Sequence, residues 1–156
     1  MSAGNAGTQD VAEALARLGV VVGDAHRALR ALPEARAALC PEGMKWSRKQ
    51  IVGHLIDSAS NNHQRFVRAQ LQPEMTFPPY VQDRWVAVQG CGDRPWADLV
   101  ALWHAYNLHL AHVAARIPEA ALDNVCTVAA DEPSTLRHHV VDYVRHLQHH
   151  LDQILG

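Results

Sequence analysis

Histidines are concentrated near the end of the chain, where five of them fall between positions 138 and 150. The surrounding stretch, residues 135–155, otherwise has the apolar periodicity of one amphipathic helix. His146 and His150 are four residues apart in it, and this spacing places two imidazoles about 6 Å apart on one helix face. Because imidazole nitrogen commonly binds divalent metal ions, the pair predicts two ligands of a metal site. A third ligand must come from elsewhere in the chain.

The segment around position 54 offers the best third ligand. His54 lies beside the apolar stripe of another predicted helix, in a polar strip with Asp57, Ser58 and Asn61. Such a strip either faces solvent or lines a cavity, so spacing alone leaves a metal-binding and a structural or exposed role open to His54. His26 is the alternative ligand. Other histidines are predicted to be exposed or bonded locally at the edge of the core: His104, His109, His112, His139 and His149.

The composition excludes several classes of function. A chain of 156 residues predicts a single domain, 1–156, which buries about 70% of its unfolded surface and needs no metal to fold. A net charge of −2 provides no basic surface for nucleic acid. No stretch resembles a signal peptide or a membrane span, and the three separated cysteines are typical of reduced thiols. We therefore expect a soluble cytoplasmic protein with frayed residues 1–7 and no nucleic-acid or membrane partner.

Hydrophobic periodicity predicts four long helices and no strand. The second helix has a capping box, with Ser47 as the N-cap and Gln50 three residues later, and Ser134 is the expected N-cap of the last helix. Prolines close the first three helices. The fold class expected is all-α, a four-helix bundle with long connecting loops. In chain order the predicted helices span residues 8–32, 47–72, 94–117 and 135–155.

Two connections are long for a compact bundle. Residues 73–92 and 118–133 are both expected to be loops. The first carries Phe77, Tyr80 and Trp85 among prolines, a composition that suits a loop covering a pocket.

Three segments together resemble the DinB/YfiT-like superfamily of metalloenzymes. They are Trp46–Phe66, Tyr80–Gly90 and Tyr143–Ile154, and they carry the patterns W-S-x6-H-L and H-L-x-x-H-x-x-Q-I. In that superfamily, a histidine of the second helix and an H-x-x-x-H pair of the last helix bind a divalent metal at one end of a four-helix bundle. Matched motif by motif, the resemblance implies that the ligands are His54, His146 and His150.

The chemistry that the resemblance implies is metal-dependent. Three neutral imidazoles leave a divalent ion its full charge and an open position, which is typical of catalytic sites, and zinc and nickel both suit imidazole. Characterised relatives imply a thiol-dependent S-transferase that joins a small-molecule thiol to an electrophilic substrate. The alternative is a non-catalytic, stress-associated binding protein with adventitious metal or none. The sequence identifies no catalytic residue, and the glycine-rich, zinc-finger and Ser-His-Asp patterns are absent.

Several polar and aromatic residues could support the site, each with a second role left open. Asp142 lies four residues before His146 and either orients that imidazole or is a solvated carboxylate. The others either line a pocket or make ordinary packing contacts: Ser58, Asn62, Tyr80, Trp85 and Tyr143.

The large aromatic side chains of the sequence predict that the protein forms an oligomer. Trp85, Trp96 and Trp103 add large apolar side chains to four apolar helix stripes, and the resembling proteins commonly pair. We therefore expect a homodimer with a two-fold interface.

Overall fold

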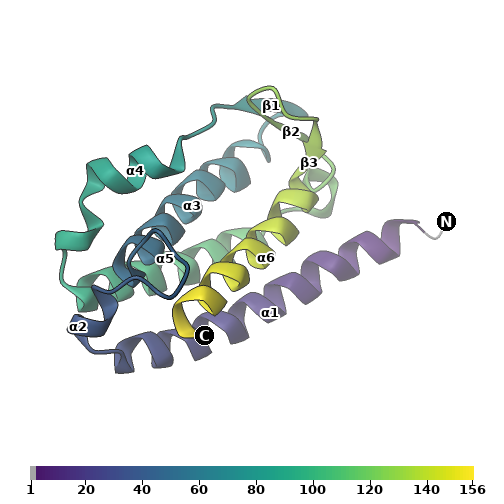
Figure 1. Cartoon of the computed structure of the whole chain (residues 1–156). Helices are drawn as coiled ribbons and strands as arrows, with labels where there is room; N and C mark the ends of the chain where they lie inside the picture. The colour runs from purple at the N-terminus through teal and green to yellow at the C-terminus, as the bar shows by residue number, and fades with distance from the viewer. Residues whose placement is uncertain (1–2) are drawn as a thin grey trace.

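Four long helices form the body of the protein. The computed structural model describes residues 3–156. Each long helix packs against two of the others: α1 against α5 and α6, and α3 against the same two (Figure 1). The four-helix bundle expected from periodicity is therefore confirmed. These helices are α1 (Ala3–Ala31), α3 (Arg48–Arg68), α5 (Trp96–Ala115) and α6 (Leu136–Leu155).

Neighbouring helices α3 and α6 run in opposite directions, whereas α3 and α5 run the same way. Arg48 at the start of α3 donates from Nε to the carbonyl oxygen of Ile154 at the end of α6, at 3.0 Å. Lys49 at the start of α3 donates from Nζ to the carbonyl oxygen of Arg94, just before α5 begins, at 2.8 Å. Because α3 and α5 are parallel neighbours, the chain between them must return along the length of the bundle, which explains the long connection.

The core forms where the apolar faces of the four long helices pack together. Each long helix contributes residues at intervals of three and four, the spacing that places them on one helix face. The largest fully buried side chains are Leu18 and Leu29 of α1, Ile51, Leu55 and Phe66 of α3, Leu99, Trp103 and Leu110 of α5, and Leu136, Leu147, Leu151 and Ile154 of α6.

The two connections expected to be loops contain secondary structure, so the prediction of no strand was wrong. The three short strands form one sheet in the order β1-β2-β3, with β1 parallel to β2 and β2 antiparallel to β3. Strands of two to four residues are too short to show alternation, and they exist only because segments about fifty residues apart pair. The connecting elements are α2 (Glu34–Ala37), β1 (Glu74–Phe77), α4 (Gln82–Gln89), η1 (Cys91–Asp93), η2 (Glu119–Ala121), β2 (Val125–Val128) and β3 (Ser134–Thr135).

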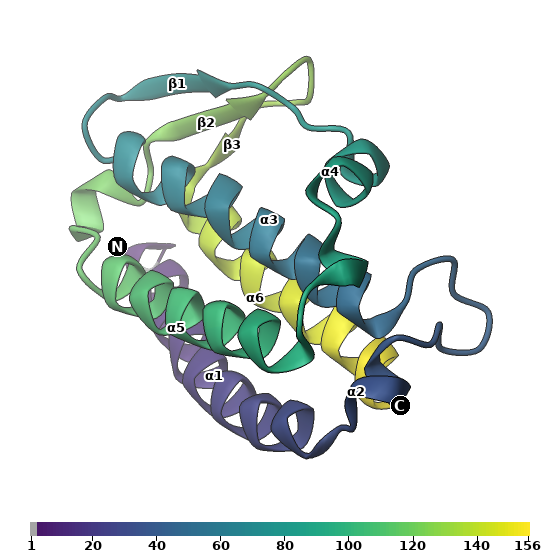
Figure 2. The ribbon, with the colours of Figure 1, turned by 90° about the vertical axis from the view of Figure 1, so that its left-hand side faces the viewer.

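The sheet and α4 cover the side of α3 and α6 that is opposite to α1 (Figure 2). A buried carboxylate attaches α4 there, because Gln89 of α4 donates to Asp57 of α3 at 2.7 Å. None of the helices within residues 3–156 combines the length and the apolar character that a membrane crossing requires.

The N-termini of the helices test the capping residues and starting positions that the sequence predicted. The capping box is confirmed: Gln50 N donates to the Ser47 hydroxyl, and Ser47 N donates to the Gln50 side chain. The N-cap of α6 is Thr135 rather than Ser134, because the Thr135 hydroxyl accepts from His138 N at 3.2 Å, whereas the Ser134 hydroxyl bonds the His139 ring. The helix α1 begins at Ala3, and the fraying expected of residues 1–7 stays a prediction. Alanine favours helix there, and residues 1–2 lie outside the described residues.

One glycine of α3 permits a close contact with η1. A Cβ built on Gly53 would lie 2.5 Å from Cys91 Sγ and 2.8 Å from Cys91 Cβ, closer than real side chains approach. Gly53 and Cys91 are both buried, so an added methyl group must displace the Cys91 side chain. Gly19, on the exposed surface of α1, has nothing within 4 Å of its Cβ position.

We predict opposite effects of alanine at these two glycines. Gly53→Ala should lower the free energy of unfolding by roughly 1–3 kcal/mol through overpacking. Gly19→Ala should raise it by up to about 1 kcal/mol, because alanine favours the helix. Urea denaturation of both variants measures the two changes, and equal stability of Gly53→Ala and the wild type would contradict the close contact.

Candidate metal centre

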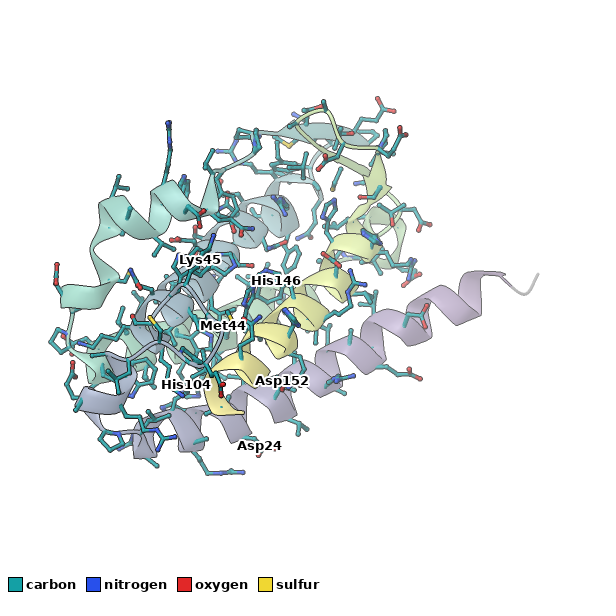
Figure 3. All side chains as sticks on the ribbon, in the orientation of Figure 1. Asp24, Met44, Lys45, His104, His146 and Asp152 are labelled. Carbon is teal, nitrogen blue, oxygen red and sulfur yellow. The ribbon has the colours of Figure 1, made fainter. Side chains whose placement is uncertain are left out.

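Three imidazoles from two helices converge between α3 and α6. The Nε2 atom of His146 lies 3.4 Å from Nε2 of His54 and 3.1 Å from Nε2 of His150. All three potential ligand atoms lie within 4.8 Å of one another. Figure 3 labels His146 on the side of α6 that faces α3. His54 is fully buried and the other two are half-buried. The structure thus brings together the three histidines that the sequence singled out.

The hydrogen bond that the Nδ1 atom of a histidine makes determines which tautomer its ring adopts. The Nδ1–H of His150 donates to the side-chain oxygen of Gln153 at 2.7 Å, which leaves a lone pair on its Nε2. Nδ1 of His146 lies 3.4 Å from the Ser58 hydroxyl. Nδ1 of His54 is buried and has no hydrogen-bond partner within the described residues. The orienting contacts therefore come from Ser58 and Gln153.

Burial keeps the three imidazoles neutral at pH 7. It lowers the pKa of His54 to about 3, and the neighbouring His150 and His146 lower it further in the same direction. Burial and His150 lower the pKa of His146 to about 4. Burial also lowers the pKa of His150. Two imidazolium ions buried at this separation would repel each other, so the neutral form of each ring is favoured.

The donor set fits a divalent metal ion. Neutral imidazole nitrogen is a preferred ligand of such ions, and three converging lone pairs repel one another unless a cation lies between them. Within residues 3–156 these histidines are the one group of three or more ligating side chains close enough to share an ion.

The loop before α3 covers the centre from one end. The Trp46 ring lies 5.2 Å from the His54 ring, between their centroids. Lys45 lies over the Trp46 ring and forms an ion pair with Asp83 of α4, at 2.7 Å. The loop and α4 are thereby joined across the polar face of α3.

A cavity of about 250 Å³ adjoins the centre at His146. It lies between α3, α6 and the segment that links β1 to α4, so its walls come from three distant parts of the chain. The lining side chains are Ser58, Asn62 and Arg65 from α3, Pro79 and Tyr80 from the connecting segment, Gln82 from the start of α4, Val128 from β2, and Asp142, Tyr143 and His146 from α6.

The expected pocket residues occupy different places. Ser58, Asn62, Asp142 and Tyr143 line the cavity, but Trp85 does not. Trp85 is 37% exposed and instead packs against Tyr80, with ring centroids 4.8 Å apart.

Two of these residues already have polar partners in the protein. The Tyr143 hydroxyl donates to Asn107 of α5 at 2.6 Å, so it is held in the core. Asp142 pairs with Arg145 and forms no hydrogen bond to His146 within the described chain. Of the two roles open to Asp142, the structure therefore favours the solvated carboxylate at the cavity wall.

The remaining histidines are separate from the centre. His26 stacks on His104 between α1 and α5, with ring centroids 3.6 Å apart, so the alternative ligand was wrong. His139 is bonded locally, as expected, to the Ser134 hydroxyl at 2.9 Å. His104 is half-buried by the stacking rather than exposed. The expected exposure is confirmed for His109, His112 and His149.

Sequence reasoning missed two residues that shape the site. Gln153 was part of the quoted H-L-x-x-H-x-x-Q-I pattern, and its position three residues after His150 on one helix could have revealed the contact. Arg65 has the same kind of local signal, because it continues the flank of His54, Ser58 and Asn62 at helical spacing.

Comparisons with known proteins agree on the architecture. The family model described as the DinB superfamily matches residues 23–154. YfiT from Bacillus subtilis, described as a probable metal-dependent hydrolase with an unusual four-helix bundle topology, has a TM-score of 0.83 at 19% identity, covering 92% of this chain and 83% of that one. A mycothiol-dependent maleylpyruvate isomerase has a TM-score of 0.78 at 14% identity, covering 92% and 60%.

One curated relative is similar in sequence. It is the "Putative metal-dependent hydrolase OB0413" of Oceanobacillus iheyensis, 26% identical over 109 residues. The match covers 70% of this chain but 62% of the relative, so it spans less than two thirds of the relative's length.

The lowered histidine pKa values predict acid sensitivity of the metal-free protein. The unfolded chain binds protons near pH 6.5 and the folded chain only near pH 3–4, so stability is present above pH 6.5 and is lost as the pH falls. Each such proton contributes at most about 1.4 kcal/mol per pH unit. With chelator present, urea denaturation from pH 7 to pH 5 should show a steeper loss for the wild type than for His54→Gln. The exposed His149→Gln should follow the wild type, and identical slopes in all three would contradict the prediction.

Proposed function

The chain belongs to the DinB superfamily, and from this premise we propose that it is a metal-dependent enzyme in which His54, His146 and His150 hold one divalent ion. The observation that carries the proposal is that the Nε2 atoms of three neutral imidazoles converge beside a cavity. Zinc and nickel are the ions that best suit this set of ligands.

A divalent ion in such a site keeps its full charge and an open position, and it lowers the pKa of a coordinating water or thiol. The protein's own residues supply the arrangement. Gln153 holds His150 in the tautomer whose Nε2 is free, and the Ser58 hydroxyl lies 3.4 Å from Nδ1 of His146. Tyr143 closes the cavity floor while its hydroxyl stays on Asn107.

The finer proposal is transfer of a small-molecule thiol to an electrophile. The thiol sulfur forms a bond to an electrophilic carbon, the leaving group departs with its electron pair, and the thiol proton goes to solvent. We propose that Asp142, the acidic side chain in the cavity wall, accepts that proton on its way out. Structural likeness to a mycothiol-dependent isomerase supports a thiol as the nucleophile.

Hydrolysis is the second candidate, because two of the similar proteins are named as metal-dependent hydrolases. The two reactions need the same centre and differ in the nucleophile, which is water in one and a thiol in the other. A non-catalytic binding protein would instead show no turnover of either kind.

We predict that untagged protein purified without chelator contains about one divalent ion per chain. His146→Ala should lower the affinity for zinc by orders of magnitude, because it removes the imidazole that contacts both others. His149→Ala should leave it nearly unchanged. Elemental analysis and competition with a chromogenic chelator measure both, and equal losses in the two variants would contradict the assignment of ligands.

We predict next that adding a cellular thiol to the zinc-loaded protein releases about one proton per site, because a coordinating sulfur is a thiolate. Consumption of thiol with an alkyl halide should require the metal and disappear in His150→Ala. Asp142→Asn should lower the rate more modestly. Turnover of an ester without thiol would favour hydrolysis, and the absence of both reactions and of proton release would favour the binding protein.

A further inference from the structure

Arg65 is a half-buried cation beside the metal centre. It lies on the flank of α3 that carries His54, Ser58 and Asn62, and it lines the same cavity as His146. Its guanidinium makes one hydrogen bond, from Nη1 to the Asn62 side-chain oxygen at 3.4 Å. Among residues 3–156 no carboxylate lies within ion-pair distance of it.

This isolation is unusual for an arginine withdrawn from water. A guanidinium has five N–H donors, and burying it costs free energy unless an anion and further acceptors compensate. Burial lowers the pKa of Arg65 below its ordinary value, although the group stays charged at pH 7. Arg137, by contrast, is paired with both Glu119 and Asp123.

The nearest acidic groups do not neutralise Arg65. Asp142 shares the cavity wall, but its carboxylate pairs with Arg145. Asp142 and, to a smaller extent, Asp131 raise the pKa of Arg65, but neither forms an ion pair with it within the described residues. Among the described charged side chains that line the cavity, Arg65 is the cation without an ion-pair partner, whereas the carboxylate of Asp142 is paired with Arg145.

A second donor lies in the same wall. The Tyr80 side chain lines the cavity and is held by its packing against Trp85. Burial raises the pKa of Tyr80, so its hydroxyl remains protonated and able to donate. Within the described chain this hydroxyl has no hydrogen-bond partner, whereas that of Tyr143 is committed to Asn107.

We infer that the cavity is a carboxylate-binding subsite, in which Arg65 pairs with a carboxylate of the small-molecule substrate and the Tyr80 hydroxyl donates a further hydrogen bond. A planar guanidinium fork matches a carboxylate in geometry, and one cation matches one negative charge. The volume of about 250 Å³ suits a short organic acid. The inference rests on the proposed function, because it places the reacting atoms of that acid toward His146.

The experiment separates carboxylate binding from metal binding. Succinate and its uncharged diamide are titrated calorimetrically into wild-type protein, once with chelator and once loaded with zinc. Succinate should bind in both states and the diamide in neither. Arg65→Gln should weaken succinate binding by roughly tenfold or more, and Tyr80→Phe should weaken it several-fold. All variants should retain about one zinc per chain.

Two further variants test whether the fork itself is needed. Arg68→Gln makes the same change of charge on the exposed face of α3, where Arg68 bonds Gln64, and should alter succinate affinity less than twofold. Arg65→Lys keeps the charge without the fork and should bind succinate with an affinity between those of wild type and Arg65→Gln. If Arg65→Gln fails to fold, the succinate affinity of Arg65→Lys still tests the inference.

The inference is overturned by any of three results. These are the absence of succinate binding to wild-type protein, equal affinity in Arg65→Gln and the wild type, and tighter binding of inorganic phosphate than of succinate at the same site. Loss of zinc with retained succinate binding would instead contradict the proposed function and leave the subsite standing.

Discussion

The antiparallel packing of α3 against α6 is the interaction on which the rest of the structure depends. It places the first turns of α3 beside the last turns of α6, as the contact from Arg48 to Ile154 shows. At the other end, the Phe66 and Tyr143 rings meet edge to face, 5.9 Å apart between centroids. A turn of α6 by one residue would rotate its face by about 100° and would remove both His146 and His150 from α3.

This packing creates a polar seam that the rest of the chain must cover. Three neutral imidazoles, a buried carboxylate and a half-buried guanidinium lie along one flank of α3 or opposite it. Burying such groups is costly without partners. The chain supplies partners from the long connection that the parallel α3 and α5 require, including Gln89 on Asp57. The return segment therefore builds the wall of the site as well as linking two helices.

The centre and the cavity have different requirements. Metal binding needs three nitrogen atoms at one point, which two rigid helices supply. The proposed binding of a substrate needs charges and donors spread over a larger volume, and the long connection between α3 and α5 adds Tyr80 and Gln82 to the cavity lining. Such a surface connection can vary in sequence while the two helices keep the three histidines in place.

The sequence by itself determined what depends on neighbours within a few residues. The four helices, the Ser47 capping box and the facing pair His146 and His150 all follow from periodicity and spacing along one helix. Only the tertiary structure decided which distant groups meet. It brought His54 next to that pair, stacked His26 on His104, and formed strands from segments too short to be recognised from the sequence alone. The physical reason is that side-chain direction is local, whereas helix order and register are set by the packing of the whole chain.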